Sequence, residues 1–307
     1  MHSPQNLPPY PAMVELRPGH RDVLEEALAK ADPCISELTF AYLWLWQPYT
    51  SCRLSRFRDE LVIICRSAKT GESYAFAPLC ETEKESAHLI PELLRADGPV
   101  TRCARVPDDI AEHLKRSPDL QLTATRGRAD YVHHAEALRE LPGTSFHAKR
   151  NQIRQFKKAC PDAQYHPVNP NLAARCSEFC QRWLEEHPKN EVNSLQREVE
   201  TTRRMLNHME WLRISGGALL HKGEVIAFAL GEPLTDSTFI ERVEKADTSY
   251  PGSYQAINRA FARHVASGYE WINREQDMGV RGLRRAKKSY NPHHLIRKYE
   301  IELSGQK

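Results

Sequence analysis

A two-residue turn, Lys222-Gly223, between two apolar runs is the feature that most constrains the fold of this chain. The flanking runs, residues 212–221 and 225–232, are rich in aliphatic residues, and a two-residue turn that contains glycine joins such runs as an antiparallel hairpin. A third strand-like run at 237–244 extends the hairpin into a meander. We therefore predict an antiparallel sheet in the C-terminal half of the chain.

Helical and strand-like runs surround this meander. Before it we predict a basic helix at 144–158, a strand at 163–168 and helices at 172–187 and 194–209; after it, a helix at 254–267, a strand at 270–274, a helix at 280–289 and a strand at 297–303. The N-terminal half is predicted to contain a helix at 19–31, an apolar and aromatic stretch at 38–49, strands at 52–57, 61–66 and 74–79, a helix at 81–95, a strand at 100–106, a helix at 108–116 and a strand at 120–125.

The composition is that of a globular protein. A length of 307 residues suffices for two domains, and 40% apolar with 27% charged residues excludes a disordered chain. The net charge of +3 does not by itself indicate a nucleic-acid binder. No apolar run approaches the roughly 20 residues of a membrane span, and the proline-rich N-terminus lacks a signal-peptide pattern. We therefore expect a cytoplasmic protein without a transmembrane segment.

Eight cysteines are scattered along the chain without a Cys-x-x-Cys pair. Cys65 lies inside a strand-like run, and Cys176 and Cys180 share the inner side of a predicted helix with Phe179 and Trp183. We interpret the cysteines as reduced, buried thiols rather than as a metal or redox site.

Two predicted strands near the C-terminus end in carboxylates. Glu244 and Asp247 flank the end of one strand, and Glu275 and Asp277 the end of another. Residues 281–299 then include seven Arg or Lys and no acid. Sheets with crossover helices bind their ligands at such strand ends, so this pattern favours a polyanion bound beside a general base. A salt-bridged structural corner is the alternative.

The predicted helix at 280–289 has a basic face and an inner face. The basic face is formed by Arg281, Arg284, Arg285 and Lys288. Lys287 lies on the other face, where an inward ammonium needs a carboxylate or a substrate phosphate as its partner; a structural bridge to a nearby carboxylate is the alternative. The candidate catalytic residues are Glu244, Asp277 and Lys287. The candidate substrate-binding residues are Asp247, Tyr254, Glu275, Arg281 and Arg284, with a core position as the alternative for Tyr254.

A second basic stripe lies on the predicted helix at 144–158. A stripe without acidic neighbours can follow a phosphate backbone, each neutralised phosphate adding about 0.7 to 0.9 to the salt slope of binding. A solvated helix face is the alternative. The candidate nucleic-acid-binding residues are Lys149, Arg150, Arg154, Lys157 and Lys158, although Lys149 falls on the face of Ile153 and Phe156.

Other chemistry has little support in the sequence. The P-loop pattern, His-Glu-x-x-His and Gly-x-Ser-x-Gly are absent. His133-His134 and His293-His294 are adjacent pairs whose side chains point different ways, so we predict no metal site.

The order of the predicted elements resembles a known fold. A meander followed by helix, strand, helix and strand is the order of the GNAT acyltransferase fold, and the N-terminal half resembles a degenerate copy. We therefore predict an α/β (α+β) protein with two tandem GNAT, or acyl-CoA N-acyltransferase-like, domains whose central sheets are mixed and mostly antiparallel. The degenerate domain is predicted at 1–140 and the second domain at 141–307, opened by the basic linker helix.

Specific residues resemble the C-terminal domain of phosphatidylglycerol lysyltransferases. They are Leu141-Pro-Gly-Thr-Ser-Phe-His147-Ala-Lys-Arg150-Asn151 at the linker helix, and Glu244-Lys-Ala, Tyr254-Gln-Ala-Ile-Asn258, Ile272-Asn-Arg-Glu-Gln-Asp277, Gly282-Leu-Arg-Arg-Ala-Lys287 and Ser289-Tyr290 in the second domain. The resemblance implies transfer of an aminoacyl group from aminoacyl-tRNA. Full-length lipid synthases of this family carry membrane spans that this sequence lacks, so the acceptor stays open between a lipid at a membrane surface and a small amine or hydroxyl compound.

Two alternative functions remain at the level of sequence. The first is a CoA-dependent N-acyltransferase. The loop expected to hold the CoA pyrophosphate falls at 244–254, where two acids and one glycine disfavour CoA, so we predict no cofactor. The second is a non-catalytic module that binds RNA or a protein partner on the same fold.

Overall fold

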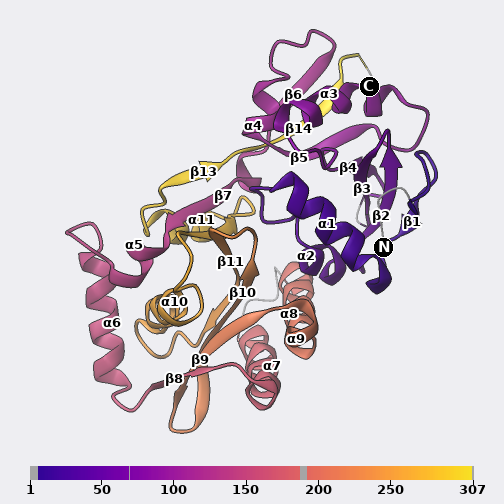
Figure 1. The fold of residues 1–307 in the computed structure, drawn as a ribbon. Coiled ribbons are helices and arrows are strands. Elements are labelled where there is room, and N and C mark those ends of the chain that lie inside the picture. Colours follow the sequence, from indigo (N-terminus) through magenta and orange to yellow (C-terminus); the bar gives the residue numbers. More distant parts are fainter. Residues whose placement is uncertain (1–5, 69, 187–191, 306–307) are drawn as a thin grey trace. The chain divides into compact units, whose positions relative to one another are not determined.

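The computed structural model describes residues 6–68, 70–186 and 192–305, which form two compact units (Figure 1). Unit 1 comprises residues 1–130, 276–281 and 295–307, and unit 2 comprises residues 131–275 and 282–294. Each unit is built on its own sheet. No helix among the residues that the structure describes is both long and apolar enough to cross a membrane.

Unit 1 carries a mixed sheet with the strand order β1-β2-β3-β4-β5-β14-β6. Its elements are β1 (Val14–Glu15), α1 (Arg21–Ala31), α2 (Phe40–Leu45), β2 (Thr50–Phe57), β3 (Glu60–Ser67), β4 (Ser73–Ala75), α3 (Glu83–Arg95), β5 (Arg102–Pro107), α4 (Asp108–Glu112), β6 (Leu120–Ala124) and β14 (Lys298–Leu303). The core between α3 and the sheet consists of aliphatic side chains such as Ile64, Ile90 and Leu93.

Unit 2 carries a sheet with the order β13-β7-β12-β11-β10-β9-β8. Its elements are β7 (Asp130–His134), α5 (Ala135–Glu140), α6 (His147–Ala159), β8 (Gln164–Pro167), α7 (Pro170–Glu185), α8 (Val192–Asn207), α9 (Met209–Leu212), β9 (Ser215–His221), β10 (Glu224–Pro233), β11 (Thr238–Ala246), α10 (Ser253–His264), β12 (Trp271–Gln276), α11 (Arg281–Lys288) and β13 (His294–Ile296).

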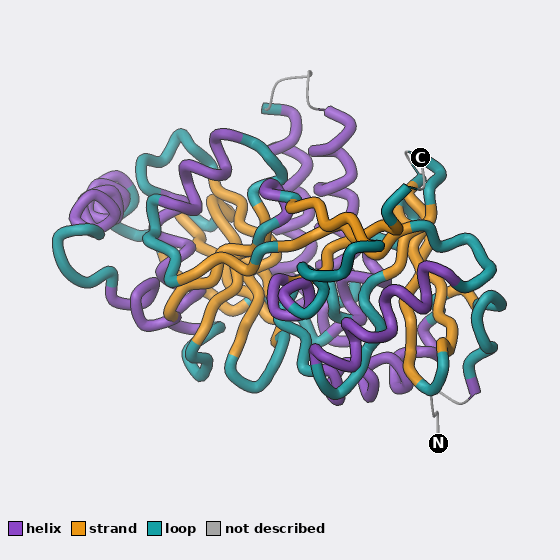
Figure 2. The backbone as a smooth tube through the Cα atoms, turned by 90° about the horizontal axis from the view of Figure 1, so that it is seen from above, coloured by secondary structure: helices purple, strands orange, loops and turns teal. Residues whose placement is uncertain are grey.

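Helices cover both faces of the unit 2 sheet (Figure 1). On one face, Phe156 of α6 and Phe261 of α10 share a core with Ala229 and Phe239 of the strands. On the other face, the ring of Phe179 on α7 packs edge-on against the ring of Phe228, with the two ring centres 6.0 Å apart. The helices α7 and α8 pack side by side (Figure 2).

The predicted meander is confirmed. Across the turn, His221 pairs with Glu224, and both turn residues have the positive φ that a two-residue hairpin requires: 51° at Lys222 and 82° at Gly223. The start of the predicted strand at 212 is wrong, because residues 209–212 form α9, and Arg213, in the left-handed conformation, ends that helix.

The two units repeat one arrangement, and the prediction of tandem GNAT folds is confirmed at this level. In each unit a meander leads through a helix to a strand that pairs in parallel with the last meander strand: β4 with β5, and β11 with β12. Two residues beyond the last pair, both β5 and β12 contain a non-glycine residue with positive φ, Arg105 at 58° and Glu275 at 55°. The shared kink shows that the two parallel pairs end in the same way.

The end of the chain lies in unit 1. We predicted a division at residue 140, whereas the compact units divide at residue 130, and β14 is inserted between β5 and β6. The buried ammonium of Lys298 on β14 donates to Glu37 and to Asp130, the latter at 2.7 Å, and Arg105 lies 3.5 Å from Glu37. These partners compensate the cost of burying the Lys298 charge and hold β14 in place.

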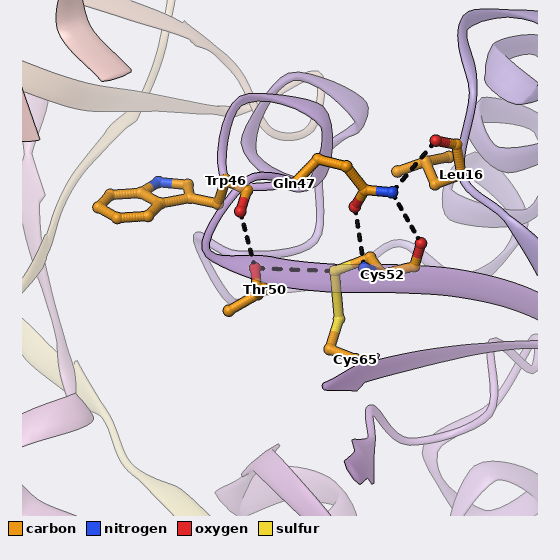
Figure 3. Close-up of a disulfide and its surroundings, with 6 residues drawn as sticks. All are labelled: Leu16, Trp46, Gln47, Thr50, Cys52 and Cys65. Carbon is orange, nitrogen blue, oxygen red and sulfur yellow. Dashed lines mark hydrogen bonds between the residues drawn. A yellow bond between two sulfur atoms is a disulfide. The ribbon is translucent and has the colours of Figure 1, made fainter. Parts of the chain in front are cut away.

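A disulfide joins Cys52 of β2 to Cys65 of β3, so the prediction of reduced thiols is wrong for this pair (Figure 3). The two residues are direct partners in the antiparallel ladder, a position that the scattered cysteine pattern did not reveal. The side chain of Gln47 closes the end of β2, since it donates to the Leu16 and Cys52 carbonyls and accepts from the Cys52 N–H. The other cysteines, of which all but Cys34 are buried, are free thiols as predicted.

Candidate functional site

The parallel strands β11 and β12 diverge soon after they pair. Their ladder covers three positions and ends where Ile240 meets Asn273. Beyond this pair the ladder between the two strands stops. We call the region between the unpaired ends of β11 and β12 the wedge. This is the strand-end position at which the sequence placed the candidate site.

A bulge in β11 determines which side chains enter the wedge. The ladder with β10 pairs Glu241 with Gly231 and Val243 with Leu230, and thus skips Arg242. Without the extra residue, positions 241 and 244 would face opposite sides of the sheet; with it, both Glu241 and Glu244 face the side covered by α10.

Both carboxylates hold the same guanidinium. Arg274 of β12 donates to Glu241 at 2.7 Å and to Glu244 at 2.5 Å. The amide of Asn258 on α10 donates to Glu241 at 3.1 and 3.2 Å and to Glu244 at 3.1 Å. Glu241, Glu244, Asn258 and Arg274, together with the Lys149 and Tyr290 side chains described below, form what we call the Arg274 cluster.

The surroundings of Glu241 shift its acidity. Burial and the neighbouring Glu244 raise the pKa of Glu241 to about 8, against the opposing effect of Arg274. A buried carboxyl beside a second carboxyl group favours its protonated form. Glu241 is therefore the member of the pair that is suited to hold a proton.

One guanidinium nitrogen of this cluster has no hydrogen-bond partner. The Lys149 ammonium is 4.1 Å from the centre of the Tyr290 ring, and the Arg274 carbon Cζ is 4.8 Å from the same ring. Among the residues that the structure describes, none hydrogen-bonds the buried Arg274 Nη1. The Tyr290 hydroxyl interacts with Gln255, and the His133 ring with the Tyr290 backbone. Burial lowers the pKa of Lys149 and, together with Arg274, that of His133, the latter to about 3. Native proteins leave few buried polar groups without a hydrogen bond, so the unbonded Arg274 Nη1 indicates that the cluster is built for a ligand.

Lys287 points inward, as predicted. Its ammonium donates to the Arg274 carbonyl, on the backbone that carries the cluster guanidinium. Lys287 thus contacts the main chain that carries the cluster guanidinium.

The carboxylate of Glu275 lies in a different network. Arg242, the residue that the bulge inserts, donates to Glu275 at 2.5 Å and to Glu232 at 2.7 Å, and its side chain is 3% exposed. Glu275 therefore has a structural ion-pair partner, and substrate binding by Glu275 stays a prediction.

Tyr254 and Asp247 stabilise the surroundings of the wedge. The Tyr254 hydroxyl accepts from the Trp183 indole at 3.3 Å, and the Trp183 ring lies under the Lys245 ammonium at 3.5 Å. Asp247 accepts from the Ser249 N–H at 2.8 Å and closes the turn before α10.

The start of α10 is covered by α6. A side-chain carbon at Gly252, whose φ is 83°, would lie 2.1 Å from the Gln152 carbonyl oxygen. The Ser253 hydroxyl donates to the Asp247 carbonyl at 2.7 Å. Two backbone carbonyl groups thus lie at this helix terminus, where a pyrophosphate would need free backbone N–H groups, so the terminus does not fit the CoA pyrophosphate.

Asp277 belongs to unit 1. It is buried, accepts from Arg126 at 3.2 Å and accepts from the Gly279 N–H at 2.8 Å. The carboxylate therefore has structural partners within its own unit, and the cluster in unit 2 is complete without it.

The basic stripe of α6 is confirmed in part. Arg154, Lys157 and Lys158 are exposed, whereas Arg150 donates to the Gly143 carbonyl at 2.7 Å. The assignment of Lys149 to this stripe is wrong, because its side chain is buried against Tyr290 on the opposite face of the helix. On α11, Arg281 is exposed and Arg284 is partly buried.

Four members of the Arg274 cluster were absent from our candidate site residues: Glu241, Asn258, Arg274 and Tyr290. Asn258, Arg274 and Tyr290 do lie in the stretches that resemble the lysyltransferase family. A second signal in the sequence was the presence of charged residues within apolar strands. An Arg or Glu in such a run needs a buried partner. No group of three or more potential ligands placed to hold a metal ion occurs in the described part of the chain.

Unit 1 has a cavity of about 50 Å³ at the equivalent place in the repeat. It is lined by Phe76 after β4, Thr82 at the start of α3, Arg105 at the kink of β5 and Asp109 of α4. Its lining combines apolar side chains with the carboxylates of Asp32, Glu83 and Asp109.

Comparison with known proteins places this geometry in a family. A conserved protein of unknown function from Bacteroides thetaiotaomicron has a TM-score of 0.85 and 28% identity, covering 95% of this chain and 99% of that one. L-PGS from Bacillus licheniformis has a TM-score of 0.57 and 13% identity over 82% of this chain and 83% of that chain, a likeness that shows the fold alone.

A curated relative and a family model agree with the structural comparison. An uncharacterized protein of Mycoplasmoides gallisepticum is 23% identical over 193 residues, which are 62% of this chain and 61% of the relative, so the match spans about three fifths of that protein. The model of the phosphatidylglycerol lysyltransferase C-terminal domain matches residues 29–302. The chain therefore belongs to the phosphatidylglycerol lysyltransferase C-terminal domain family.

Proposed function

We propose that this chain is an aminoacyltransferase that moves an aminoacyl group from aminoacyl-tRNA to a hydroxyl or amine acceptor at the Arg274 cluster. Family membership and the GNAT-like fold support a transferase of the acyltransferase class. The observation that carries the proposal is the Glu241–Glu244 carboxylate pair on Arg274, with the unbonded Arg274 Nη1 beside it.

The transfer reaction needs no covalent intermediate on the protein, because the aminoacyl ester is already activated. The acceptor must be oriented and must lose a proton, and the tetrahedral oxyanion must be stabilised. Glu244, with its side chain 14% exposed, is the more accessible member of the acid pair and takes the proton. The Tyr290 hydroxyl, the Lys149 ammonium and the Arg274 Nη1 are the donors for the oxyanion.

The step balances within these groups. The acceptor oxygen or nitrogen bonds to the ester carbonyl carbon as its proton passes to Glu244. Collapse of the tetrahedral intermediate breaks the bond to the ribose oxygen of the tRNA, and the same proton passes to that oxygen. The free tRNA leaves with a restored hydroxyl, and the carboxylate pair returns to its starting state.

Two features support an RNA donor over CoA. The exposed cations of α6, Arg154, Lys157 and Lys158, form a stripe that suits a phosphate backbone. The start of α10, which would hold a pyrophosphate, is covered by the Gln152 carbonyl. The acceptor is open, with a lipid headgroup as the candidate that family membership suggests.

The prediction for the donor concerns the α6 stripe. Lys157→Glu with Lys158→Glu should weaken aminoacyl-tRNA binding at least tenfold and lower the salt slope by about 2, because each phosphate contact adds about 1 to the slope. Filter binding with a labelled aminoacyl-tRNA pool measures both quantities. Arg285→Glu with Lys288→Glu on α11 is the matched control with the same change in charge, and it should bind like the unaltered protein.

A turnover assay distinguishes the aminoacyl-tRNA-dependent enzyme from the CoA-dependent enzyme and from the non-catalytic module. The full chain is incubated with labelled aminoacyl-tRNA or labelled acetyl-CoA, together with lipid vesicles or small amines as acceptors. Transfer of the label from aminoacyl-tRNA to an acceptor supports the proposal. Consumption of acetyl-CoA instead would establish the CoA-dependent alternative, and equal binding of charged and uncharged tRNA without turnover would establish the non-catalytic module.

A further inference from the structure

The strand β6 forms one edge of the unit 1 sheet and is paired on one side only. The strand order places β14 beside β6 and no described strand on its other side. The Thr125 N–H donates to the Lys298 carbonyl at 2.9 Å, and the Ser304 N–H donates to the Asp119 carbonyl at 2.8 Å. Hydrogen-bonded pairs in an antiparallel ladder recur at every second residue, so the odd-numbered residues 119 to 125 bond to β14.

The even-numbered residues of β6 therefore direct their backbone groups away from the sheet. The N–H and C=O groups of Leu122 and Ala124 and the C=O group of Leu120 point outward, where they have no ladder partner among the described strands. A row of unpaired backbone groups at a sheet edge is a template for a further strand.

The sequence of β6 lacks the features that protect a sheet edge. The run Leu120-Gln-Leu-Thr-Ala-Thr125 contains no charged residue and no proline, the residues with which proteins prevent pairing between edges. Gln121, Thr123 and Ala124 are exposed. A further strand can therefore reach this edge without meeting a charge or a missing N–H group.

The other edges of the two sheets are protected by comparison. The strand β1 has two residues, β13 has three, and β8 has four and ends in Pro167. Short strands and proline both limit pairing with a further strand. Among the described strands, β6 with its five residues is thus the edge most open to pairing.

We propose that β6 pairs with β6 of a second copy of this chain, antiparallel about a two-fold axis at Leu122. In this register Leu122 lies opposite Leu122 of the other copy, and Ala124 lies opposite Leu120. On the other face of the sheet, Gln121 lies opposite Thr123. Apolar side chains thus meet apolar ones and uncharged polar side chains meet each other, so the strand complements itself on both faces.

The same register satisfies the outward backbone groups. The two copies of Leu122 exchange N–H and C=O hydrogen bonds, and the Ala124 N–H of each copy reaches the Leu120 carbonyl of the other. Leu122 is partly buried against the core under α3, and pairing would remove its exposed part from water in both copies. A second copy supplies all these matching groups by symmetry, whereas a different protein would need them in its own sequence.

Analytical ultracentrifugation of the full chain tests the proposal. The unaltered protein should reach twice the mass of one chain as its concentration rises. Gln121→Lys with Thr123→Lys places like charges opposite each other across the pair, and Ala124→Pro removes an outward N–H without breaking the β14 ladder. Each variant should raise the dissociation constant of the dimer at least about tenfold.

A charge swap locates the contact in β6. Gln121→Glu with Thr123→Glu should also weaken the dimer, but an equimolar mixture of this variant with the lysine variant should dimerise again, because opposite charges then face each other. This recovery also requires both variants to be folded. Gln164→Lys with His166→Lys, at the same spacing on the edge strand β8, is the matched control and should keep the mass of the unaltered protein.

The outcomes are distinct. A protein that stays monomeric up to its solubility limit would overturn the proposal. A dimer that persists in both the lysine variant and Ala124→Pro would lie on another surface and would also overturn it, as would a mixture that does not recover. The assay contains neither tRNA nor an acyl donor, so its result is independent of the proposed function.

Discussion

Glu244→Gln should lower the rate of aminoacyl transfer by about 100- to 10,000-fold, because general-base catalysis contributes a factor of this size. The substitution keeps the shape of the side chain and an oxygen that can accept from Arg274 and Asn258, so the fold is retained. Single-turnover transfer of label from aminoacyl-tRNA measures this effect.

Glu275→Gln is the matched control for this substitution. Glu275 is also an ion-paired carboxylate at the diverging strands, but its partner is Arg242 in a separate network. The control should keep transfer within a few-fold of the unaltered protein. A Glu244→Gln variant that transfers normally, or a Glu275→Gln variant that is equally inactive, would contradict the role given to Glu244.

Arg274→Met should destabilise the protein by about 3 to 5 kcal/mol. The guanidinium holds two carboxylates, with Arg274 10% exposed, and removing one partner of a buried ion pair leaves the charge of the other uncompensated. Adding Glu241→Gln and Glu244→Gln to the same chain should recover most of the loss, because the amides carry no charge to compensate. Urea-induced unfolding measures all three proteins through the shift of the midpoint.

An exposed pair of the same type is the control. Arg263 lies 3.0 Å from Glu140, with the two side chains 41% and 55% exposed. Arg263→Met should cost no more than about 1 kcal/mol, since solvent screens such pairs. Equal losses for the two arginines would show that the Arg274 cluster has no special role in stability.

Local patterns in the sequence predicted most of the elements. The Lys222-Gly223 hairpin follows from the preference of a two-residue turn for positive φ, a purely local property. Amphipathic helices such as α3 and α10 follow from the spacing of their apolar residues. By contrast, β7 (Asp130–His134) was missed, because a five-residue strand that ends in two histidines has neither alternation nor an apolar run to mark it.

Which strands pair with which across long distances in the chain could not be predicted from the sequence. Alternation in Tyr299, Ile301 and Leu303 predicts a strand, but nothing in the strand itself specifies which sheet it joins. Lys298 decides this in the structure through Glu37 and Asp130, two acids more than 160 residues away in the chain. Ion pairs between such distant positions leave no periodic signal in a single sequence.

The candidate site likewise has one part that the sequence predicted and one part that only the structure shows. Carboxylates at the strand ends pointed to the region of the Arg274 cluster, which contains Glu244 and which Lys287 contacts through the Arg274 carbonyl. The bulge at Arg242 turns Glu241 onto the same face as Glu244, and simple alternation predicts the opposite. Bulges have weak sequence signals, so the acid pair and its shared Arg274 emerge only from the strand register.

Co-crystallisation with an aminoacyl-adenosine analogue, in which an amide replaces the labile ester, tests most directly whether the Arg274 cluster binds the aminoacyl group. We predict that the amide carbonyl oxygen lies within about 3.2 Å of the Tyr290 hydroxyl, the Lys149 ammonium or Arg274 Nη1, with a Glu244 oxygen facing the carbonyl carbon. An analogue bound only elsewhere, with those donors still buried and without a ligand, would contradict this role of the cluster.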